Sequence, residues 1–213
     1  MPVQYDKNAH SPGRTKVYVN SLRYFFWPLY RIMNRLEYTG RENIPQGVPL
    51  VVVANHLSNI DPPLVSTVVD LPVAYLAKKE LYKMPGFKEF CLFYGAISID
   101  RDKPEKSTFK LVKELMAKGW ALGMFIEGTR NKTPGILGQP HTGPAYFAKA
   151  NKAMIVPVGI TGTNVPFGKV YARIGNPIKP TDDLDKTTWE IMAALSDLTG
   201  FALPTRHETV DQV

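Results

Sequence analysis

Apolar and polar positions along this chain fall into two alternating patterns. Short, continuous apolar runs of the kind that form buried strands lie at 37–40, 49–54, 72–77, 95–99, 121–126, 154–160 and 170–175. Segments with apolar residues at helical spacing lie between or after them, at 62–70, 86–93, 104–118, 142–151 and 187–199. Strands that alternate with helices predict an α/β fold with a mostly parallel central sheet flanked by helices.

Prolines and glycines add detail to two of these segments. The helix at 104–118 has Pro104 near its start and Gly119 as a stop signal after its end. Pro157 lies inside the apolar run 154–160 and has no N–H to donate to a neighbouring strand. We therefore expect that run to be an edge strand or to contain a bulge.

The N-terminal part of the chain differs from the rest. Residues 1–13 are polar and read as a loose tail, whereas 14–36 are dense in aromatic residues and arginine, with Pro28 expected to kink a helix. Tyrosine, tryptophan and arginine favour the membrane interface, so we predict an amphipathic helical membrane-binding segment. The alternative is an ordinary helix packed on the domain. We accordingly divide the chain into 1–36 and an enzymatic domain at 37–213.

Net charge and composition indicate which kind of partner the protein binds. The formal net charge is +7, which favours an anionic partner. The basic residues are spread along the chain without a nucleic-acid-binding motif, so an anionic membrane surface or a phosphorylated substrate fits better. No window reaches the roughly 20 apolar residues of a simple spanning helix. The single cysteine, Cys91, excludes a disulfide within the chain, and its apolar neighbours favour a buried, unreactive thiol.

The segment 55–62 carries the strongest chemical signal. His56 follows the apolar run 49–54, and Asp61 comes five residues later, directly before Pro62. That spacing places the two side chains on different faces of a regular helix, so they meet only if the chain turns between them. Asp61 is expected to cap the next helix, with Pro62 at its first position. Histidine moves protons near neutral pH and a carboxylate can hold its tautomer. The alternative is that Asp61 only caps the helix.

Two arginines stand at the ends of apolar runs. Arg101 follows 95–99, and Arg130 follows 121–126. The guanidinium group offers paired donors that match phosphate oxygens, so both arginines are candidates for a phosphate clamp, although surface salt bridges are the usual alternative. Gly128 allows close approach of the backbone to a ligand, and Thr129 offers a hydroxyl donor.

The order of these blocks resembles the glycerolipid and lysophospholipid acyltransferase family. That family carries an Asn-His pair, four spacers and an aspartate, then Asp-Arg, Glu-Gly-Thr-Arg and Val-Pro-Val blocks. Here they stand at 55–61, 100–101, 127–130 and 156–158, and the resemblance spans about 40–177. His-x4-Asp alone is weak evidence, but four blocks in order, each beside a predicted strand, make a strong signal.

The resemblance assigns roles to further residues. Arg101 and the block at 127–130 would bind the acceptor phosphate, with Glu127 either orienting an arginine or contacting the glycerol. Lys78 matches a family lysine that faces the active site and would stabilise an oxyanion; the alternative is a solvated lysine. No cofactor is expected besides the acyl thioester, and the four histidines show no paired spacing typical of a metal site.

The implied function is acyl transfer at a membrane surface. His56 would take the proton from the 2-hydroxyl of lysophosphatidate, Asp61 would hold the imidazole, and the alkoxide would attack an acyl carrier protein or coenzyme A thioester, forming phosphatidate. The protein would act as a peripheral protein on the cytoplasmic side of the membrane. The alternatives are acylation of another lysophospholipid or of glycerol-3-phosphate, and a lipid-binding protein without turnover.

Overall fold

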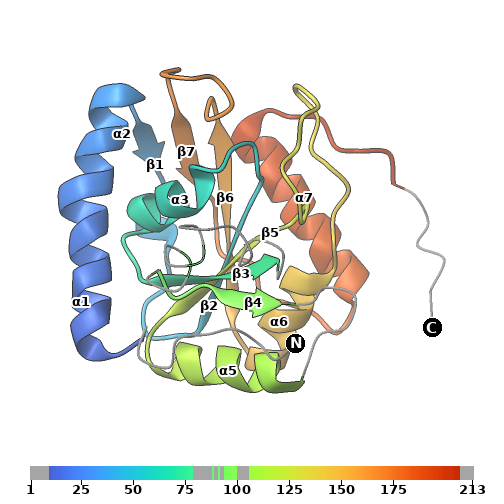
Figure 1. The fold of residues 1–213 in the computed structure, drawn as a ribbon. Helices are drawn as coiled ribbons and strands as arrows, with labels where there is room; N and C mark the ends of the chain where they lie inside the picture. The colour runs from blue at the N-terminus through green and yellow to red at the C-terminus, as the bar shows by residue number, and fades with distance from the viewer. Residues whose placement is uncertain (1–9, 79–87, 89–90, 92–93, 100–105, 207–213) are drawn as a thin grey trace.

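A twisted, mostly parallel sheet forms the centre of the molecule (Figure 1). The computed structural model describes residues 10–78, 88, 91, 94–99 and 106–206. Within these ranges the strands are β1 (Glu37–Thr39), β2 (Leu50–Ala54), β3 (Val73–Lys78), β4 (Ile97–Ile99), β5 (Ala121–Phe125), β6 (Met154–Thr161) and β7 (Tyr171–Ile174). Their spatial order is β1-β7-β6-β2-β5-β3-β4, and only β6 and β7 pair antiparallel. The predicted fold class is confirmed.

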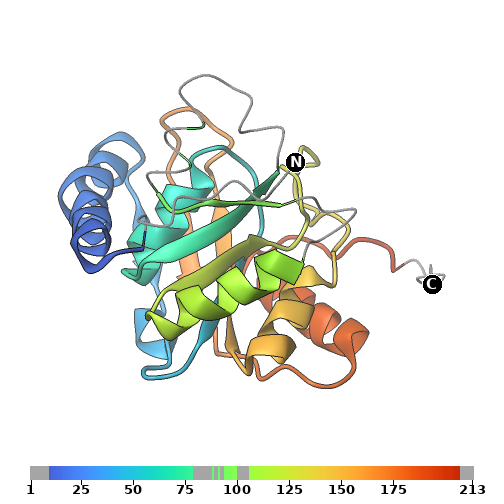
Figure 2. The same cartoon turned by 60° about the horizontal axis from the view of Figure 1, so that its bottom comes forward.

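Helices cover both faces of this sheet. The described helices that follow the first strand are α3 (Asp61–Val69), α5 (Lys106–Ala117), α6 (Gly143–Asn151) and α7 (Leu184–Thr199). Figure 2 shows α5, α6 and α7 gathered on one side of the sheet, and α3 lies on the other. The helix predicted at 86–93 lies almost entirely outside the described residues, as does the predicted start of the helix at 104–118.

The central strand β2 shows why the apolar run at 49–54 is continuous rather than alternating. All five residues of β2 are buried, because β5 and β6 flank it and helices cover both faces. Val51 and Val53 pack with residues of α5, α6 and α7, whereas Val52 and Ala54 pack with residues of α3. The carboxyl ends of β2 and β5 meet at one edge of the sheet, where the Ile126 N–H donates to the Ala54 carbonyl at 3.1 Å.

The N-terminal residues form one helical segment along the side of the domain (Figure 1). It consists of α1 (Pro12–Ser21), a π-helical stretch (Leu22–Phe26) and α2 (Trp27–Met33). The kink expected at Pro28 stays a prediction; the π-helical stretch ends two residues before Pro28, and the Trp27 N–H donates to the Leu22 carbonyl. No helix of the described residues is long and apolar enough to cross a membrane.

Of the two alternatives expected at Pro157, the edge strand is wrong, whereas the pairing on the β7 side does contain a bulge. Ile155 bridges Ile178 and Val158 pairs with Ile174, so residues 156–157 of β6 lie opposite residues 175–177. β6 lies inside the sheet, between β7 and β2, and its register with β2 runs unbroken from Met154 to Val158. The missing N–H falls at the very end of the β6–β7 ladder, where the Pro157 carbonyl still accepts the Gly175 N–H at 2.9 Å. Proline is tolerated there because it removes one terminal hydrogen bond and leaves the rest of the ladder intact.

Candidate active site

Asn55 is the point at which the chain leaves the sheet. Its side chain is fully buried, and its amide extends the pairing of β2 with β6: Nδ2 donates to the Ile160 carbonyl at 2.9 Å, and Oδ1 accepts the Ile160 N–H at 2.7 Å. A side chain thus takes the place of the next backbone bridge, because the main chain is already turning away. His56 is placed by this turn at the carboxyl end of a rigid, buried strand.

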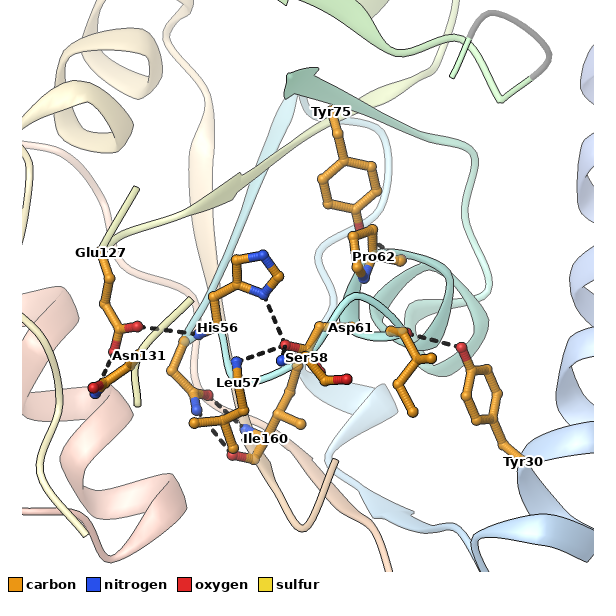
Figure 3. Close-up of polar contacts among 12 residues, drawn as sticks. Tyr30, His56, Leu57, Ser58, Asp61, Pro62, Tyr75, Glu127, Asn131 and Ile160 are labelled. Atoms are coloured by element: carbon orange, nitrogen blue, oxygen red, sulfur yellow. Dashed lines mark hydrogen bonds and ion pairs between the residues drawn. The ribbon is translucent and has the colours of Figure 1, made fainter. Parts of the chain in front are cut away.

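His56 and Asp61 lie in contact across the turn (Figure 3). The Nδ1 atom of His56 is 2.8 Å from Oδ2 of Asp61, and the Asp61 side chain is fully buried. An ionised carboxylate only accepts hydrogen bonds, so this contact places the proton on Nδ1 and leaves Nε2 with a lone pair in the neutral imidazole. The same Oδ2 accepts the N–H groups of Leu57 and Ser58, each at 2.7 Å. The carboxylate therefore fastens the whole turn.

The prediction that Asp61 caps the next helix is wrong. α3 begins at Asp61 itself, Ile60 occupies the cap position, and no side chain caps the helix. The first amide of the helix with a helical partner, that of Leu64, donates to the Ile60 carbonyl at 3.2 Å. The Asp61 carboxylate points back toward His56 instead, because three donors in the preceding turn already bind it.

The imidazole ring rests on an aromatic stack. Phe125, the last residue of β5, lies 4.0 Å from His56 between ring centroids, at an interplanar angle of 17°. Tyr75 of β3 stacks on the far side of Phe125, with centroids 5.7 Å apart. Stacked rings of this kind pack face to face, so Phe125 restrains the orientation of the imidazole.

Glu127 binds backbone groups of the site and is not exposed at its surface. The side chain is only 4% exposed, and its carboxylate accepts the N–H of Gly138 at 3.0 Å and that of His56 at 3.4 Å, with the Asn131 amide at 3.5 Å (Figure 3). The Asn131 N–H in turn donates to the His56 carbonyl at 2.7 Å. Burial raises the pKa of Glu127, and these hydrogen bonds oppose that rise.

A cavity of about 300 Å³ opens beside the imidazole. One part of its wall is polar and includes His56, Gly128, Thr129 and Arg130. The rest is largely apolar or aromatic and comes from α1, α3, β3 and the end of β5, together with Cys91, Tyr94 and Ala96. A space with a proton acceptor, a cation and an apolar wall suits a substrate that has a polar head and a hydrocarbon part.

The other predicted residues differ in how much of each the structure describes. Lys78 is the last residue of β3, next to Ala77 of the cavity wall, but its side chain lies outside the described part of the chain. Arg101 lies outside the described residues altogether. Cys91 is buried, and burial raises the pKa of its thiol to about 11, so it stays protonated at neutral pH. In the described ranges no group of three or more His, Cys, Asp or Glu side chains is placed to hold a metal ion.

Three aromatic residues around the site were not predicted from sequence. Phe125 stands two residues before the block at 127–130, and that position was a usable signal. Tyr30 and Tyr75 lie in segments far from His56 in the chain, yet their hydroxyls bond the turn that contains Asp61. No local motif marks them, because their importance depends on which segments the fold brings together.

This chain is similar to known acyltransferases. A family model described as Acyltransferase matches residues 35–161, more than half of the chain. The 1-acyl-sn-glycerol-3-phosphate acyltransferase of Bacillus subtilis is 25% identical over 82% of this chain and 89% of its own length. The protein of the same name from Borreliella burgdorferi is 30% identical over 59% of this chain, which spans about half of that relative.

A solved structure shares the fold. The crystal structure of the 1-acyl-sn-glycerophosphate acyltransferase PlsC from Thermotoga maritima superposes with a TM-score of 0.71, at 23% identity, over 87% of this chain and 79% of that one. The resemblance inferred from the four sequence blocks is confirmed by the family match. All four blocks lie within the matched residues, and this chain belongs to the acyltransferase family.

Proposed function

We propose that this chain is a 1-acyl-sn-glycerol-3-phosphate acyltransferase. It transfers a fatty acyl group from a thioester of acyl carrier protein or coenzyme A to the 2-hydroxyl of lysophosphatidate, and phosphatidate is the product. The observation that carries the proposal is the His56–Asp61 contact of 2.8 Å at a cavity that Arg130 also lines. The names of the relatives from Bacillus subtilis and Borreliella burgdorferi support the choice of acceptor.

His56 acts as the general base. Its Nε2 atom takes the hydroxyl proton while the acceptor oxygen attacks the thioester carbonyl, and Asp61 stabilises the imidazolium through Nδ1. The tetrahedral intermediate then expels the thiolate, which takes the proton from His56 and leaves as the thiol. A positioned general base contributes about 10²–10⁴-fold in rate. Phe125 restrains the orientation of the imidazole because its ring lies 4.0 Å from that of His56.

The acceptor phosphate binds at the turn after β5. Arg130 is exposed at the cavity wall, where its guanidinium is free to meet a phosphate, and Thr129 beside it brings a hydroxyl donor. Gly128 has no side chain and lets the ligand approach the backbone closely. From the resemblance to the family, Arg101 is the second phosphate ligand, and Lys78 donates a hydrogen bond to the oxyanion. The contacts of Glu127 support an indirect part in substrate binding, in which it holds the backbone of His56 and of Gly138.

The N-terminal helical segment seats the enzyme on the membrane. Large apolar side chains on this segment point to solvent: Tyr24 is 79% exposed, Phe25 60% and Ile32 80%. Arg31 and Arg35 are exposed near its C-terminal end. Apolar side chains flanked by arginines suit an anionic bilayer surface, so we place the protein peripherally on the cytoplasmic side, where acyl thioesters and lysophosphatidate are both within reach.

A thiol-release assay tests the proposed function. Acyl-coenzyme A and acyl-acyl carrier protein are each offered with lysophosphatidate, a choline lysophospholipid or glycerol-3-phosphate, and the acylated lipid is identified. We expect thiol release with lysophosphatidate that is lost in His56→Ala and retained in His141→Ala, an exposed histidine outside the cavity wall. Thiol release only with another acceptor would show that this acceptor, and not lysophosphatidate, is the substrate. No thiol release with any acceptor would favour a lipid-binding protein without turnover.

A further inference from the structure

Two tyrosine hydroxyls bond the backbone on either side of Asp61 (Figure 3). The Tyr30 hydroxyl, from α2, donates to the Ile60 carbonyl at 2.8 Å. The Tyr75 hydroxyl, from β3, donates to the Pro62 carbonyl at 2.9 Å. The carbonyls directly before and directly after Asp61 are thus each held by a side chain from another part of the fold.

Both hydroxyls keep their proton and act as hydrogen-bond donors. Tyr30 is 2% exposed, and burial raises the pKa of both tyrosines, with the negative charge of Asp61 adding to the rise. Neither phenol ionises at a working pH, so each keeps the proton that it donates. The Pro62 carbonyl also accepts the Ser66 hydroxyl at 3.1 Å, which makes the Tyr30 bond the simpler of the two to interpret.

Asp61 depends on such support because its carboxylate is bound on one side only. Oδ2 accepts His56 Nδ1 and two backbone N–H groups, whereas Oδ1 is buried without a hydrogen-bond partner among the described residues. A small shift of the backbone at Ile60 or Pro62 would carry Oδ2 away from Nδ1. The two backbone N–H groups oppose that shift at the same oxygen, but Oδ1 adds no hydrogen bond of its own. Loss of position at a catalytic group is costly, since about 1 Å can lower a rate 100-fold.

We propose that Tyr30 and Tyr75 are positioning residues that keep Asp61 on the Nδ1 atom of His56. The effect on turnover rests on the proposed function; the effect on the imidazole does not. Tyr75 also lines the cavity and stacks on Phe125, whereas Tyr30 is absent from the cavity wall and acts only through the turn. Tyr30 belongs to the same helical segment that carries the exposed apolar side chains, so the proposed membrane-binding segment directly contacts the turn that holds the base.

The variant Tyr30→Phe removes one oxygen and keeps the buried ring. We expect kcat for lysophosphatidate to fall about tenfold while KM changes by less than about twofold, because the acceptor is still bound and only the base is misplaced. We also expect the ring ¹⁵N shifts of His56 to move from a single Nδ1–H tautomer toward a mixture. The chain has four histidines, so the signal is assigned by its loss in His56→Ala.

Thr188→Val is the matched control. It removes another buried hydroxyl, whose Oγ1 donates to the Leu184 carbonyl at 2.7 Å, from α7, which contributes no residue to the cavity wall. We expect it to leave kcat and the His56 shifts as in the wild type. Wild-type kcat and shifts in Tyr30→Phe would overturn the proposal, and so would equal losses of kcat in the two variants.

Tyr75→Phe and the double variant provide a second line of test. We expect the Tyr75 change alone to move the His56 shifts in the same direction, and the double variant to move them further. If the wild type shows no acyl transfer, the proposed function fails, and the ¹⁵N shifts of the variants still decide the positioning role. Shifts unchanged in both single variants would overturn it.

Discussion

At the scale of single residues, the site depends on one carboxylate oxygen. Oδ2 of Asp61 accepts the imidazole N–H and two backbone N–H groups, so the same atom selects the tautomer of His56 and shapes the turn that presents it. Charge-assisted hydrogen bonds of this kind are short and about twice as strong as neutral ones. Electrostatics and local structure are therefore coupled at Asp61.

Asp61→Asn tests this coupling. The amide keeps the shape of the side chain and can still accept a backbone N–H, but it loses the charge that stabilises the imidazolium. We expect kcat to fall by at least about 100-fold with a smaller effect on KM. Steady-state thiol release measures both constants, and a loss of less than about threefold would contradict the role given to the charge.

Glu127 makes stability depend on pH. Burial raises its pKa above the ordinary value of 4.5, so the folded state holds the proton more tightly than the unfolded state. This contribution to stability is complete below the unfolded pKa and is lost as pH rises through the folded pKa. Glu127→Gln has no proton to lose, so we expect its unfolding free energy to decline less over that window.

Urea denaturation at a series of pH values from about 4 to 7 measures the difference. Glu114→Gln, an exposed glutamate of α5, is the control and should follow the wild type. Parallel profiles for wild type and Glu127→Gln would show that Glu127 carries no such proton. Because Glu127 also accepts the His56 N–H, we expect Glu127→Gln to lower kcat as well.

Arg130→Ala separates the acceptor from the donor. We expect the KM for lysophosphatidate to rise roughly 10- to 150-fold, from the loss of one charged hydrogen bond worth about 1.5–3 kcal/mol, while the KM for the thioester changes little. Arg173→Ala, an exposed arginine of β7 away from the cavity wall, is the control. An equal rise in the KM values for lysophosphatidate and for the thioester would indicate that Arg130 binds the donor or stabilises the fold instead.

At the scale of elements, the turn after β2 is built from pieces of several strands. Asn55 joins it to β6, Glu127 and Asn131 join it to the turn after β5, and Tyr75 joins it to β3. Parallel strands bring their carboxyl ends to one edge, so segments separated by 70 or more residues become neighbours there. The rigidity of the site comes from the sheet.

Asn55→Ala should weaken the link between β2 and β6. It leaves the buried N–H and carbonyl of Ile160 without their partners, each at a cost of about 1–3 kcal/mol. We expect the unfolding free energy to fall by about 2–6 kcal/mol. Asn151→Ala, which removes one amide bond to the Phe147 carbonyl on α6, should cost about 1 kcal/mol or less. Equal losses in urea denaturation would contradict the bridging role.

At the scale of the whole molecule, the N-terminal helical segment has one face buried in the domain and one face exposed to solvent. Tyr18, Leu22 and Tyr30 are buried in the cores formed by the sheet and its helices, whereas Tyr24, Phe25 and Ile32 are exposed. Deletion of 1–36 would remove core residues together with the exposed face. Point substitutions on the exposed face therefore test the membrane role more sharply.

The triple variant Tyr24→Ser, Phe25→Ser and Ile32→Ser should keep its fold and lose affinity for anionic vesicles. Each exposed side chain contributes apolar area that would enter the bilayer interface, and the net charge of +7 makes binding weaker as salt rises. Co-sedimentation with anionic liposomes at two salt concentrations measures both effects. Tyr146→Ser, an exposed aromatic of α6, is the control, and unchanged sedimentation of the triple variant would assign the membrane contact to another surface.

The sequence was sufficient for the fold class, the seven strands and the family. Strands buried on both faces must be apolar along their whole length, and amphipathic helices must repeat every three to four residues, so these elements are visible in the pattern itself. The His56–Asp61 pair was also accessible, because the family blocks are local in the chain. Local patterns failed at the cap of α3, where the donors of the preceding turn bind the Asp61 carboxylate. At Pro157 the proline marked irregular pairing correctly, but only the strand order shows that β6 is not an edge strand.

Only the tertiary structure determined how the chemical groups are held. Whether Glu127 faces a ligand or the backbone, and whether Tyr30 and Tyr75 reach the carbonyls beside Asp61, depends on contacts between segments far apart in the chain. Sequence spacing carries information about neighbours within one element, because the periods of helix and strand are short. Contacts between elements depend on strand order and on the packing of buried side chains, which become specific only when the whole core is assembled.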